Sequence, residues 1–477
     1  MNKPTIKFGT DGWRGVIAQD FTFENLTYMS HAVAKVCKKK YKDRNRIYIG
    51  YDRRFLSQDF ARHCACIFAE HGFTVVWSQQ YMPTPILSWA TKQDSRSVGS
   101  IVITASHNPP TWNGFKFKEI FGGSAFKETT DEFEAALDFS MEHKIFTSEK
   151  FDDLVKNEKI QFFDLKDQYI ESVLNLVDID LIRKSQFSVG IDPMHGSGSH
   201  ILAEILEKIG VQCHEIHNNE NPCFGGRNPE PIEENLRDLS ALVRDQKLDA
   251  GFATDGDADR LGAIDEKGNS FTTQMILSSV YWHMLKHRKK AWNISRSVST
   301  TKMVDLLADA YGQKCFETPV GFKNIAKNMV EGRAHIGGEE AGGIGFDGHI
   351  PERDSIATAL MLLEMMAMSG KKLQECYSEI CREIRPYQFV RLDVHAHPEI
   401  MGKALSVLKQ DPPQSWDGRQ VDHIQDIDGL KFYLKDGSWI LVRPSGTEPI
   451  FRLYAEAESL SAANDLVRAI ETFVLQA

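Results

Sequence analysis

Two short segments combine residue types that suit phosphoryl transfer. Residues 104–109 read Thr-Ala-Ser-His-Asn-Pro and place the hydroxyl of Ser106 on a polar turn. Residues 255–260 carry three carboxylates at alternate positions, those of Asp255, Asp257 and Asp259. Hard divalent cations prefer oxygen ligands, and Mg²⁺ often binds carboxylates together with phosphate oxygens. If Ser106 carries a phosphoryl group, both segments can meet at one metal, which would make a phosphoryl-transfer site.

Each segment also follows an apolar run that is typical of a buried strand. Ser100–Ile103 precedes the serine, and the aspartates lie between Leu248–Ala253 and Leu261–Ile264. Ligands of open α/β sheets bind outside the carboxyl ends of the strands, and binding residues are often found on loops. Two plainer interpretations stay open, an ordinary turn serine before Asn-Pro and a solvated acidic turn.

Alternating strand-like and helix-like segments predict layered α/β domains over most of the chain. A length of 477 residues fits three or four domains, and we place their limits at 1–155, 156–260, 261–384 and 385–477. The last region differs from the others. There, two alternating runs, Leu430–Leu434 and Trp439–Arg443, flank an Asp-Gly turn, which predicts a β-hairpin.

A glycine-rich segment, Pro193–Gly198, lies between a predicted strand and a predicted helix. Such a turn can bind phosphate at the helix N-terminus, but G-x-G-x-x-G is missing. A turn that only reverses the chain tightly is an equal alternative.

The composition excludes several classes of protein. Apolar residues make up 42% and charged residues 26% of the chain, as is usual for a globular protein. A net charge of −10 argues against a nucleic-acid binder. No apolar run reaches the roughly 20 residues that a membrane span needs, and the N-terminus shows no signal-peptide pattern. The eight cysteines form no C-x-x-C pair, so we expect reduced thiols in a cytoplasmic protein.

Five motifs together resemble the α-D-phosphohexomutases, the family of phosphoglucomutase, phosphomannomutase and phosphoglucosamine mutase. They occur in the family's order and cover nearly the whole chain: Phe8–Gly15, Thr104–Pro109 with Asn113–Lys116, Asp255–Arg260, Gly338–Gly342 and Arg443–Pro449. The resemblance implies three mixed-sheet α/β/α domains and a smaller C-terminal α+β domain around a central cleft.

The resemblance also implies a reaction. Ser106 would be a phosphoserine that interconverts hexose 1-phosphates and hexose 6-phosphates through a 1,6-bisphosphate. The implied cofactors are Mg²⁺, held by Asp255, Asp257, Asp259 and the serine phosphate, and glucose 1,6-bisphosphate as activator. The implied partner is a phosphosugar, with no nucleic acid or membrane, and the protein would be a monomer or a homodimer.

Further residues acquire expected roles from the same resemblance. Lys116 is the expected general acid/base and would need a depressed pKa, which neighbouring cations could supply. His107 is the alternative, because a histidine titrates near neutrality. Arg260 would bind a phosphate oxygen, orient a carboxylate, or be purely structural. The expected substrate-binding residues are Arg14, Lys323, Glu339, Ala341, Arg443, Ser445, Gly446 and Thr447; for Lys323 an exposed helix residue is the alternative.

The sugar loop favours the glucose-preferring branch of the family. Glu339 would accept hydrogen bonds from ring hydroxyls, whereas Ala341 lacks the hydroxyl that the family usually has there. Gly343 stands where mannose-tolerant members and glucosamine mutases tend to carry histidine. We therefore expect glucose phosphates first and mannose phosphates second. The alternatives are a phosphoglucosamine mutase, a phosphosugar hydrolase, and a non-catalytic sugar-phosphate binding or scaffold protein.

Overall fold

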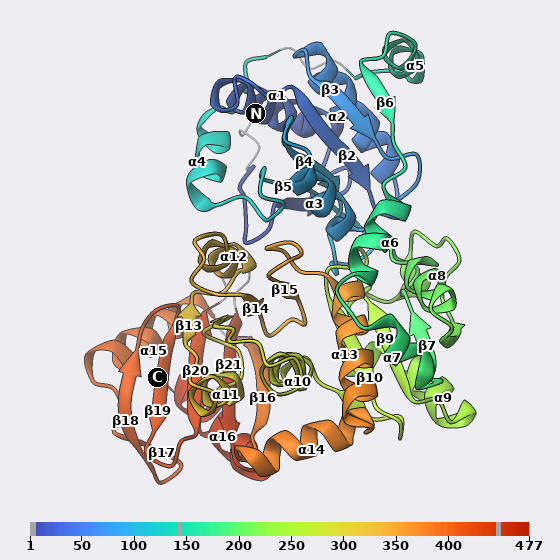
Figure 1. Cartoon of the computed structure of the whole chain (residues 1–477). Coiled ribbons are helices and arrows are strands. Elements are labelled where there is room, and N and C mark those ends of the chain that lie inside the picture. Colours follow the sequence, from blue (N-terminus) through green and yellow to red (C-terminus); the bar gives the residue numbers. More distant parts are fainter. Residues whose placement is uncertain (1–5, 142–144, 396, 445–449, 477) are drawn as a thin grey trace.

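The computed structural model describes residues 6–141, 145–395, 397–444 and 450–476. Three mixed sheets and one antiparallel sheet follow one another along the chain, as the sequence predicts. Figure 1 shows the first domain above the second and third, with the fourth beside the third. Within the described part of the chain, no helix is both long and apolar enough to cross a membrane.

The first sheet has the strand order β1-β5-β4-β2-β3-β6. Its parallel strands β4, β2, β3 and β6 continue into the antiparallel strands β5 and β1. The strands are β1 (Trp13–Val16), β2 (Arg46–Tyr51), β3 (Thr74–Trp77), β4 (Ser97–Ile103), β5 (Trp112–Lys118) and β6 (Ile160–Phe162). The helices are α1 (Phe23–Lys40), α2 (Ser57–Glu70), α3 (Thr84–Gln93), α4 (Lys127–Ala135) and α5 (Ser148–Lys156).

The second sheet has the order β11-β10-β9-β7-β8, and the third has β13-β12-β14-β15. The strands of the second domain are β7 (Ser188–Asp192), β8 (Gln212–Glu215), β9 (Ala250–Thr254), β10 (Leu261–Ile264) and β11 (Ser270–Phe271), and its helices are α6 (Lys166–Leu174), α7 (Ile179–Lys184), α8 (Ile201–Lys208) and α9 (Arg237–Gln246). The strands of the third domain are β12 (Ile294–Ser297), β13 (Cys315–Thr318), β14 (Ile336–Gly338) and β15 (Ile344–Phe346). Its helices are α10 (Thr273–Lys286), α11 (Met303–Ala310), α12 (Phe322–Val330), α13 (Ser355–Ser369) and α14 (Leu373–Glu383).

One strand order recurs in these three sheets. The runs β5-β4-β2-β3, β10-β9-β7-β8 and β15-β14-β12-β13 are equivalent, and each consists of three parallel strands with an antiparallel strand at one side. The antiparallel pair in each run is joined by a loop, and these three loops carry Ser106, the three aspartates and Glu339. The first sheet extends along the chain to β6 and the second to β11. The domain limits expected at residues 155 and 260 remain predictions.

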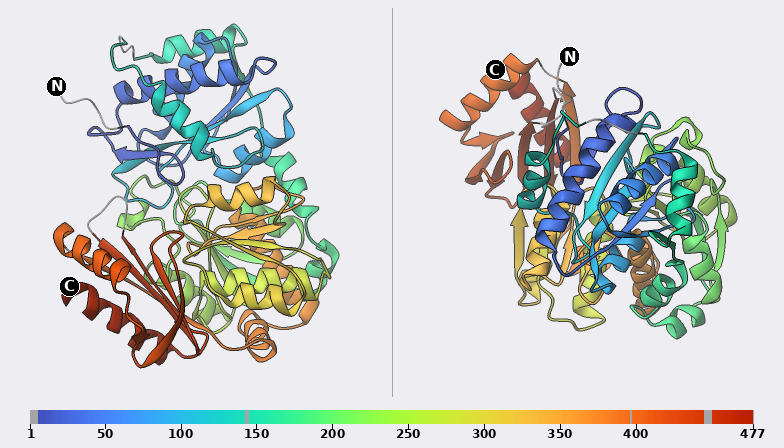
Figure 2. Two further views of the ribbon diagram at one scale, coloured as in Figure 1. Left: turned by 90° about the vertical axis from the view of Figure 1, so that its left-hand side faces the viewer. Right: turned by 90° about the horizontal axis from the view of Figure 1, so that it is seen from above.

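The fourth domain is an antiparallel sheet of order β16-β21-β20-β19-β18-β17 with two helices. Its elements are β16 (Gln388–His395), β17 (Ser415–Trp416), β18 (Arg419–Gln425), β19 (Leu430–Leu434), β20 (Trp439–Pro444), β21 (Ile450–Ala457), α15 (Pro398–Gln410) and α16 (Leu460–Gln476). The predicted hairpin is confirmed, because β19 pairs with β20 across the Asp-Gly turn. The turned views of Figure 2 keep this domain, drawn in red, at the side of the molecule.

Helix α13 joins the cores of the second and third domains. It contacts α7, α10, β9 and β10, and every residue from its start to Met366 is buried. Its one charged side chain, Glu364, accepts hydrogen bonds from Arg288 and lies 2.7 Å from Nε2 of His283. A buried carboxylate needs such partners, since an unpaired charge in an apolar core is strongly unfavourable.

Buried ion pairs join the third and fourth sheets. Glu317 on β13 lies 2.6 Å from Nη1 of Arg296 on β12 and 2.8 Å from Nζ of Lys431 on β19. Val298 and Tyr433 pack in an apolar cluster at the same interface. The fourth domain is therefore attached to the third by both apolar and ionic contacts.

Candidate active site

Ser106 lies in the loop between β4 and β5 with its side chain buried. Its backbone has φ +54°, a left-handed conformation that is unusual for a residue other than glycine. The N–H of Ser106 donates to Oγ1 of Thr104 at 2.8 Å, and its own Oγ donates to Oδ2 of Asp255 at 2.7 Å. The serine of the first domain thus meets the aspartate loop of the second, as the sequence predicts.

The three aspartates lie in the loop between the antiparallel strands β9 and β10, and all three are buried. One carboxylate oxygen from each lies within 4.8 Å of the others. Oδ1 of Asp257 and Oδ1 of Asp259 are buried without a hydrogen-bond partner. Burial and the two neighbouring carboxylates raise the pKa of Asp255 well above its ordinary value. Unpaired carboxylate oxygens that repel one another are the donor set that a hard divalent cation binds.

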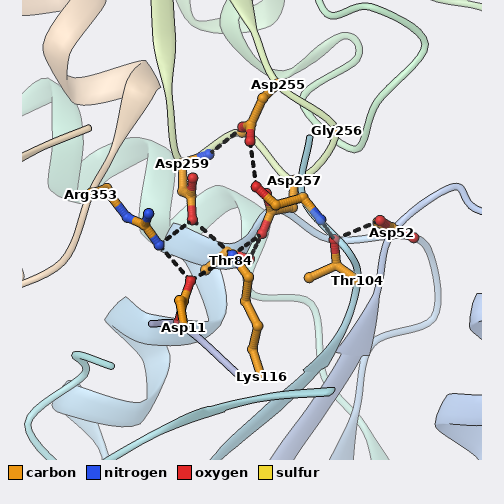
Figure 3. Close-up of polar contacts among 12 residues, drawn as sticks. Asp11, Asp52, Thr84, Thr104, Lys116, Asp255, Gly256, Asp257, Asp259 and Arg353 are labelled. Carbon is orange, nitrogen blue, oxygen red and sulfur yellow. Dashed lines mark hydrogen bonds and ion pairs between the residues drawn. The ribbon is translucent and has the colours of Figure 1, made fainter. Parts of the chain in front are cut away.

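Lys116 extends from β5 into this cluster, as Figure 3 shows. Its Nζ lies 2.7 Å from Oδ2 of Asp257, 2.9 Å from Oδ2 of Asp259 and 2.8 Å from Oδ2 of Asp11. Burial would lower the pKa of Lys116, but these three carboxylates outweigh burial and raise it. The expectation of a depressed pKa is therefore wrong, because the nearest charges in space are anions rather than cations.

Arg353 connects the first three domains. Its Nη2 lies 2.5 Å from Oδ2 of Asp11 and 2.8 Å from Oδ2 of Asp259, and its Nη1 lies 2.9 Å from Oε1 of Glu339. Figure 3 shows the guanidinium between Asp11 of the N-terminal motif and Asp259 of the aspartate loop, and its contact with Glu339 adds the sugar loop. Lys118, two residues after Lys116 on β5, extends the network to Asp11 and Glu352 at 3.0 and 2.8 Å.

The glycine-rich segment of the second domain supports the aspartate loop. The N–H of Ser197 donates to the carbonyl of Gly256 at 2.9 Å. A Cβ on Gly196 would lie 2.9 Å from that carbonyl oxygen, and one on Gly198 would lie 2.6 Å from Oγ1 of Thr254. Glycine is required here because two backbone segments approach closely. Of the two interpretations from the sequence, the structure favours the turn needed for close packing.

The loop between β14 and β15 is a tight turn held by its own backbone. The N–H of Glu339 donates to the carbonyl of Gly343, and the N–H of Gly342 donates to the carbonyl of Glu339, both at 3.2 Å. Ala341 lies half-buried at this turn. A Cβ on Gly343 would lie 2.2 Å from Cδ and 3.0 Å from Cβ of Arg353. Because Arg353 fills the space, position 343 has no room for a side chain.

The other expected residues lie at different distances from this centre. Nη1 of Arg14 donates to Oδ1 of Asn108 in the serine loop at 2.5 Å. Nδ1 of His107 lies 3.4 Å from Oγ of Ser106, and burial together with nearby cations, Arg260 first, holds the pKa of His107 well below its usual range. Arg260 is nearly buried, and its Nη1 lies 3.8 Å from Oε1 of Glu230.

Two expected residues have no described contact with the aspartate cluster. Nζ of Lys323 donates to the carbonyl of Gly9 at 3.3 Å, which places it beside the N-terminal motif. Nε of Arg443 lies 3.0 Å from Oδ1 of Asp428, within the fourth domain. Ser445, Gly446 and Thr447 lie outside the described residues.

Four residues of the site were given no role by the sequence argument: Asp11, Asp52, Arg54 and Arg353. Asp52 and Arg54 follow β2, so the rule used for Ser106, that binding groups follow the carboxyl ends of strands, would have found them. Asp11 stands inside a quoted motif. Arg353 stands in the segment 349–354, which resembles the glucose-preferring branch, but its partners are distant in sequence and nothing nearby indicated its role.

Comparisons with known proteins agree with this geometry. Residues 5–143, 167–268 and 273–384 match the descriptions "Phosphoglucomutase/phosphomannomutase, alpha/beta/alpha domain I", "II" and "III", and residues 392–472 match that of the C-terminal domain. The chain belongs to the phosphoglucomutase/phosphomannomutase family. It is therefore an enzyme, a phosphotransferase of the mutase type.

Relatives within this family carry different sugar names. A phosphoglucomutase/phosphomannomutase of Thermococcus kodakarensis is 33% identical over 96% of both chains. A phosphoglucosamine/phosphogalactosamine mutase of Sulfurisphaera tokodaii is 30% identical over 98% of both chains. The crystal structure of a candidate phosphomannomutase from Thermus thermophilus superimposes with a TM-score of 0.86 at 30% identity, over 100% of both chains. The family resemblance inferred from the motifs is confirmed, and the relatives leave the sugar open.

Proposed function

We propose that this enzyme interconverts hexose 1-phosphates and hexose 6-phosphates through a phosphoryl group on Ser106, with glucose phosphates preferred and mannose phosphates as second substrates. The observation that carries the proposal is the contact of Ser106 Oγ with Asp255 at 2.7 Å, inside a buried triad with two unpaired carboxylate oxygens. A hydroxyl in that position brings a phosphoryl group directly to the candidate metal ligands.

The proposed reaction has two transfers. In the first, the bond between phosphorus and Ser106 Oγ breaks, and phosphorus bonds to the free hydroxyl oxygen of the sugar phosphate, which gives a 1,6-bisphosphate. The hydroxyl proton passes to an enzyme base, and the serine oxygen takes up a proton. In the second, the bond between the other phosphorus of the bisphosphate and its sugar oxygen breaks, and that phosphorus bonds to Ser106 Oγ. The Ser106 hydroxyl proton passes to the enzyme base, and the freed sugar oxygen takes up a proton. Most of the catalysis would come from positioning and charge stabilisation.

Asp255, Asp257 and Asp259 would hold Mg²⁺, which neutralises charge on the transferring group when it is bound. Lys116, the lysine to which the resemblance assigns this role, is the proposed general acid/base. The aspartates that its Nζ contacts raise its pKa and keep it protonated, which suits the role of proton donor. His107, whose Nδ1 lies 3.4 Å from Ser106 Oγ, is the second candidate. Both side chains lie within reach of the metal loop or the serine, so substitution is needed to distinguish them.

The sugar preference is supported by Gly343. Arg353 occupies the space of a side chain at that position and lies 2.9 Å from Glu339, the proposed acceptor for ring hydroxyls. The histidine that the resemblance associates with mannose and glucosamine enzymes therefore has no room here. For the phosphate that is not transferred, we propose Arg443, Ser445, Gly446 and Thr447. Arg14 and Lys323 are proposed as further substrate contacts in the same cleft.

A direct assay tests the proposal. Glucose 1-phosphate is supplied with Mg²⁺ and catalytic glucose 1,6-bisphosphate, while glucose 6-phosphate and free phosphate are measured. Mannose 1-phosphate and glucosamine 1-phosphate run in parallel, and Ser106→Ala serves as control. We expect fast glucose turnover without phosphate release, and none in the variant. Faster turnover of glucosamine 1-phosphate would overturn the sugar preference. Predominant phosphate release would favour a hydrolase, and a role that survives in Ser106→Ala would favour a binding or scaffold protein.

A further inference from the structure

A buried arginine outside the proposed catalytic set forms hydrogen bonds with the backbone of the serine loop. We call Arg54, its partner Asp52 and their hydrogen bonds to this loop the bracket. Arg54 follows β2 and is 3% exposed. Its Nη2 donates to the carbonyls of Ser106 and Asn108 at 2.6 and 2.7 Å, and its Nη1 donates to those of Pro109 and Trp112 at 2.7 and 3.1 Å. A guanidinium carries five N–H donors, and four of them here end on the backbone of this one loop.

Asp52 uses the fifth donor and completes the bracket. Nε of Arg54 donates to Oδ2 of Asp52 at 3.1 Å, and the same oxygen accepts from Oγ1 of Thr104 at 2.6 Å. Thr104 Oγ1 in turn accepts the N–H of Ser106. Both peptide groups of the serine are therefore fixed, its N–H through Thr104 and its carbonyl by Arg54.

This bracket holds Ser106 in a strained backbone conformation. A residue other than glycine at φ +54° is held against its intrinsic preference, and such residues persist where the surroundings over-determine them. A Cβ on Gly256 would lie 2.4 Å from the carbonyl oxygen of Ser106, so the aspartate loop packs against the group that Arg54 binds. Phe224 of the second domain covers the guanidinium, with its ring centre 4.9 Å away.

We infer that Arg54 is a positioning residue that holds Ser106 in the left-handed conformation in which its Oγ faces the aspartate triad. The inference rests on the proposed function, because it concerns the orientation of the proposed phosphoryl carrier. Lysine would not replace Arg54, since an ammonium lacks the planar fork that spans four carbonyls. Displacement of a reacting group by about 1 Å can reduce a rate about 100-fold.

The neighbouring arginine offers a matched control. Arg53 is also buried, and it donates to Ser199 Oγ and the carbonyl of Asn218, both at 2.8 Å, and to Tyr81. None of these hydrogen bonds of Arg53 reaches the serine loop. Arg53→Lys and Arg54→Lys therefore remove the same group from adjacent buried positions.

The test compares the two variants with the wild type by steady-state kinetics and by ³¹P NMR of the enzyme phosphorylated with glucose 1,6-bisphosphate. For Arg54→Lys we expect kcat to fall about 100-fold, KM to stay within about threefold, and the phosphoserine resonance to shift or broaden. Arg53→Lys should keep the kcat and resonance of the wild type.

Equal effects in the two variants, or a change in KM alone, would overturn the inference. If Arg54→Lys does not fold, Asp52→Asn tests the same bracket and should lower kcat with an unchanged KM; a wild-type kcat in that variant would overturn it too. A wild-type enzyme whose Ser106 takes up no phosphoryl group would instead contradict the proposed function, whatever the arginine variants do.

Discussion

Lys116 and the aspartate triad show how much a buried site depends on its charge balance. One ammonium group lies within 3 Å of carboxylates from both Asp257 and Asp259, yet each aspartate keeps an Oδ1 without a hydrogen-bond partner. Buried carboxylates with free oxygens are unfavourable unless a cation binds them. We therefore expect a bound cation to stabilise the triad more than the protein's own cations do.

Asp257→Asn tests that statement at one side chain. The amide keeps the shape and the partners Thr84 and Lys116 but removes a negative charge. Since changes outside the ligand shell already cost about 10–100-fold in metal affinity or activity, we expect kcat/KM to fall at least about 100-fold. The Mg²⁺ concentration for half-maximal rate should rise. Asp245→Asn, on an exposed carboxylate, is the control, and a wild-type Mg²⁺ dependence in Asp257→Asn would exclude Asp257 as a ligand.

Gly343→Ala tests the packing of the sugar loop. The added methyl group would overlap Arg353 and displace its guanidinium from Glu339. We expect kcat/KM for glucose 1-phosphate to fall about tenfold, as for the loss of one charged hydrogen bond. Gly402→Ala, in the exposed helix α15 where a Cβ meets no atom, should leave activity unchanged. An unaltered kcat/KM in Gly343→Ala would show that Arg353 does not position Glu339.

The loops that join antiparallel strands form the centre of the site, and the sequence located them well. Apolar runs on either side marked the serine and aspartate loops, and the hairpin of the fourth domain was found from alternation and its Asp-Gly turn. The pKa of Lys116 was predicted wrongly because the sequence shows neighbours along the chain, such as Lys118, but not Asp11 across a domain interface. The role of Arg353 was missed for the same reason, whereas Arg54 follows β2 and the rule used for Ser106 would have found it.

The contact between β13 and β19 predicts a pH-dependent stability. Burial would raise the pKa of Glu317, but Arg296 and Lys431 outweigh burial and lower it to about 2. A carboxyl whose pKa is depressed by folding stabilises the protein above its unfolded pKa of about 4.5, here by about 3 kcal/mol, and this contribution is lost as pH falls towards 2.

Glu317→Gln should therefore lower the calorimetric midpoint most at pH 6, and the difference from the wild type should shrink between about pH 4.5 and pH 2. Lys431, left buried without its carboxylate partner, adds to the loss at pH 6, whereas Arg296 keeps its ion pair with Asp305. Glu233→Gln, on an exposed side chain, is the control. A difference that does not change with pH would show that the ion pair does not contribute through its charge.

Residues of three domains meet at the site, because the single side chain of Arg353 contacts Asp11, Asp259 and Glu339. A cation bound by the triad therefore stabilises the docked arrangement and not one loop. At 100 times its dissociation constant, a ligand adds about 2.7 kcal/mol to stability.

Mg²⁺ should accordingly raise the midpoint of thermal unfolding of this 477-residue chain by about 3 °C. Differential scanning calorimetry with and without the ion measures this directly, independently of activity. The shift should vanish in Asp257→Asn and remain in Asp245→Asn. An equal shift in both variants would place the binding elsewhere.

The strand order shared by the first three sheets bears on how this enzyme can be redesigned. Equivalent hairpin loops hold the proposed phosphoryl carrier, the proposed metal ligands and the proposed sugar acceptor, so a single scaffold would serve three separate tasks. Each task is then an exchangeable module: a sugar hairpin from a relative can be transplanted between β14 and β15 while the other two stay untouched. Such a graft has to carry its own residue for position 353, because Gly343 and Arg353 fit only as a pair.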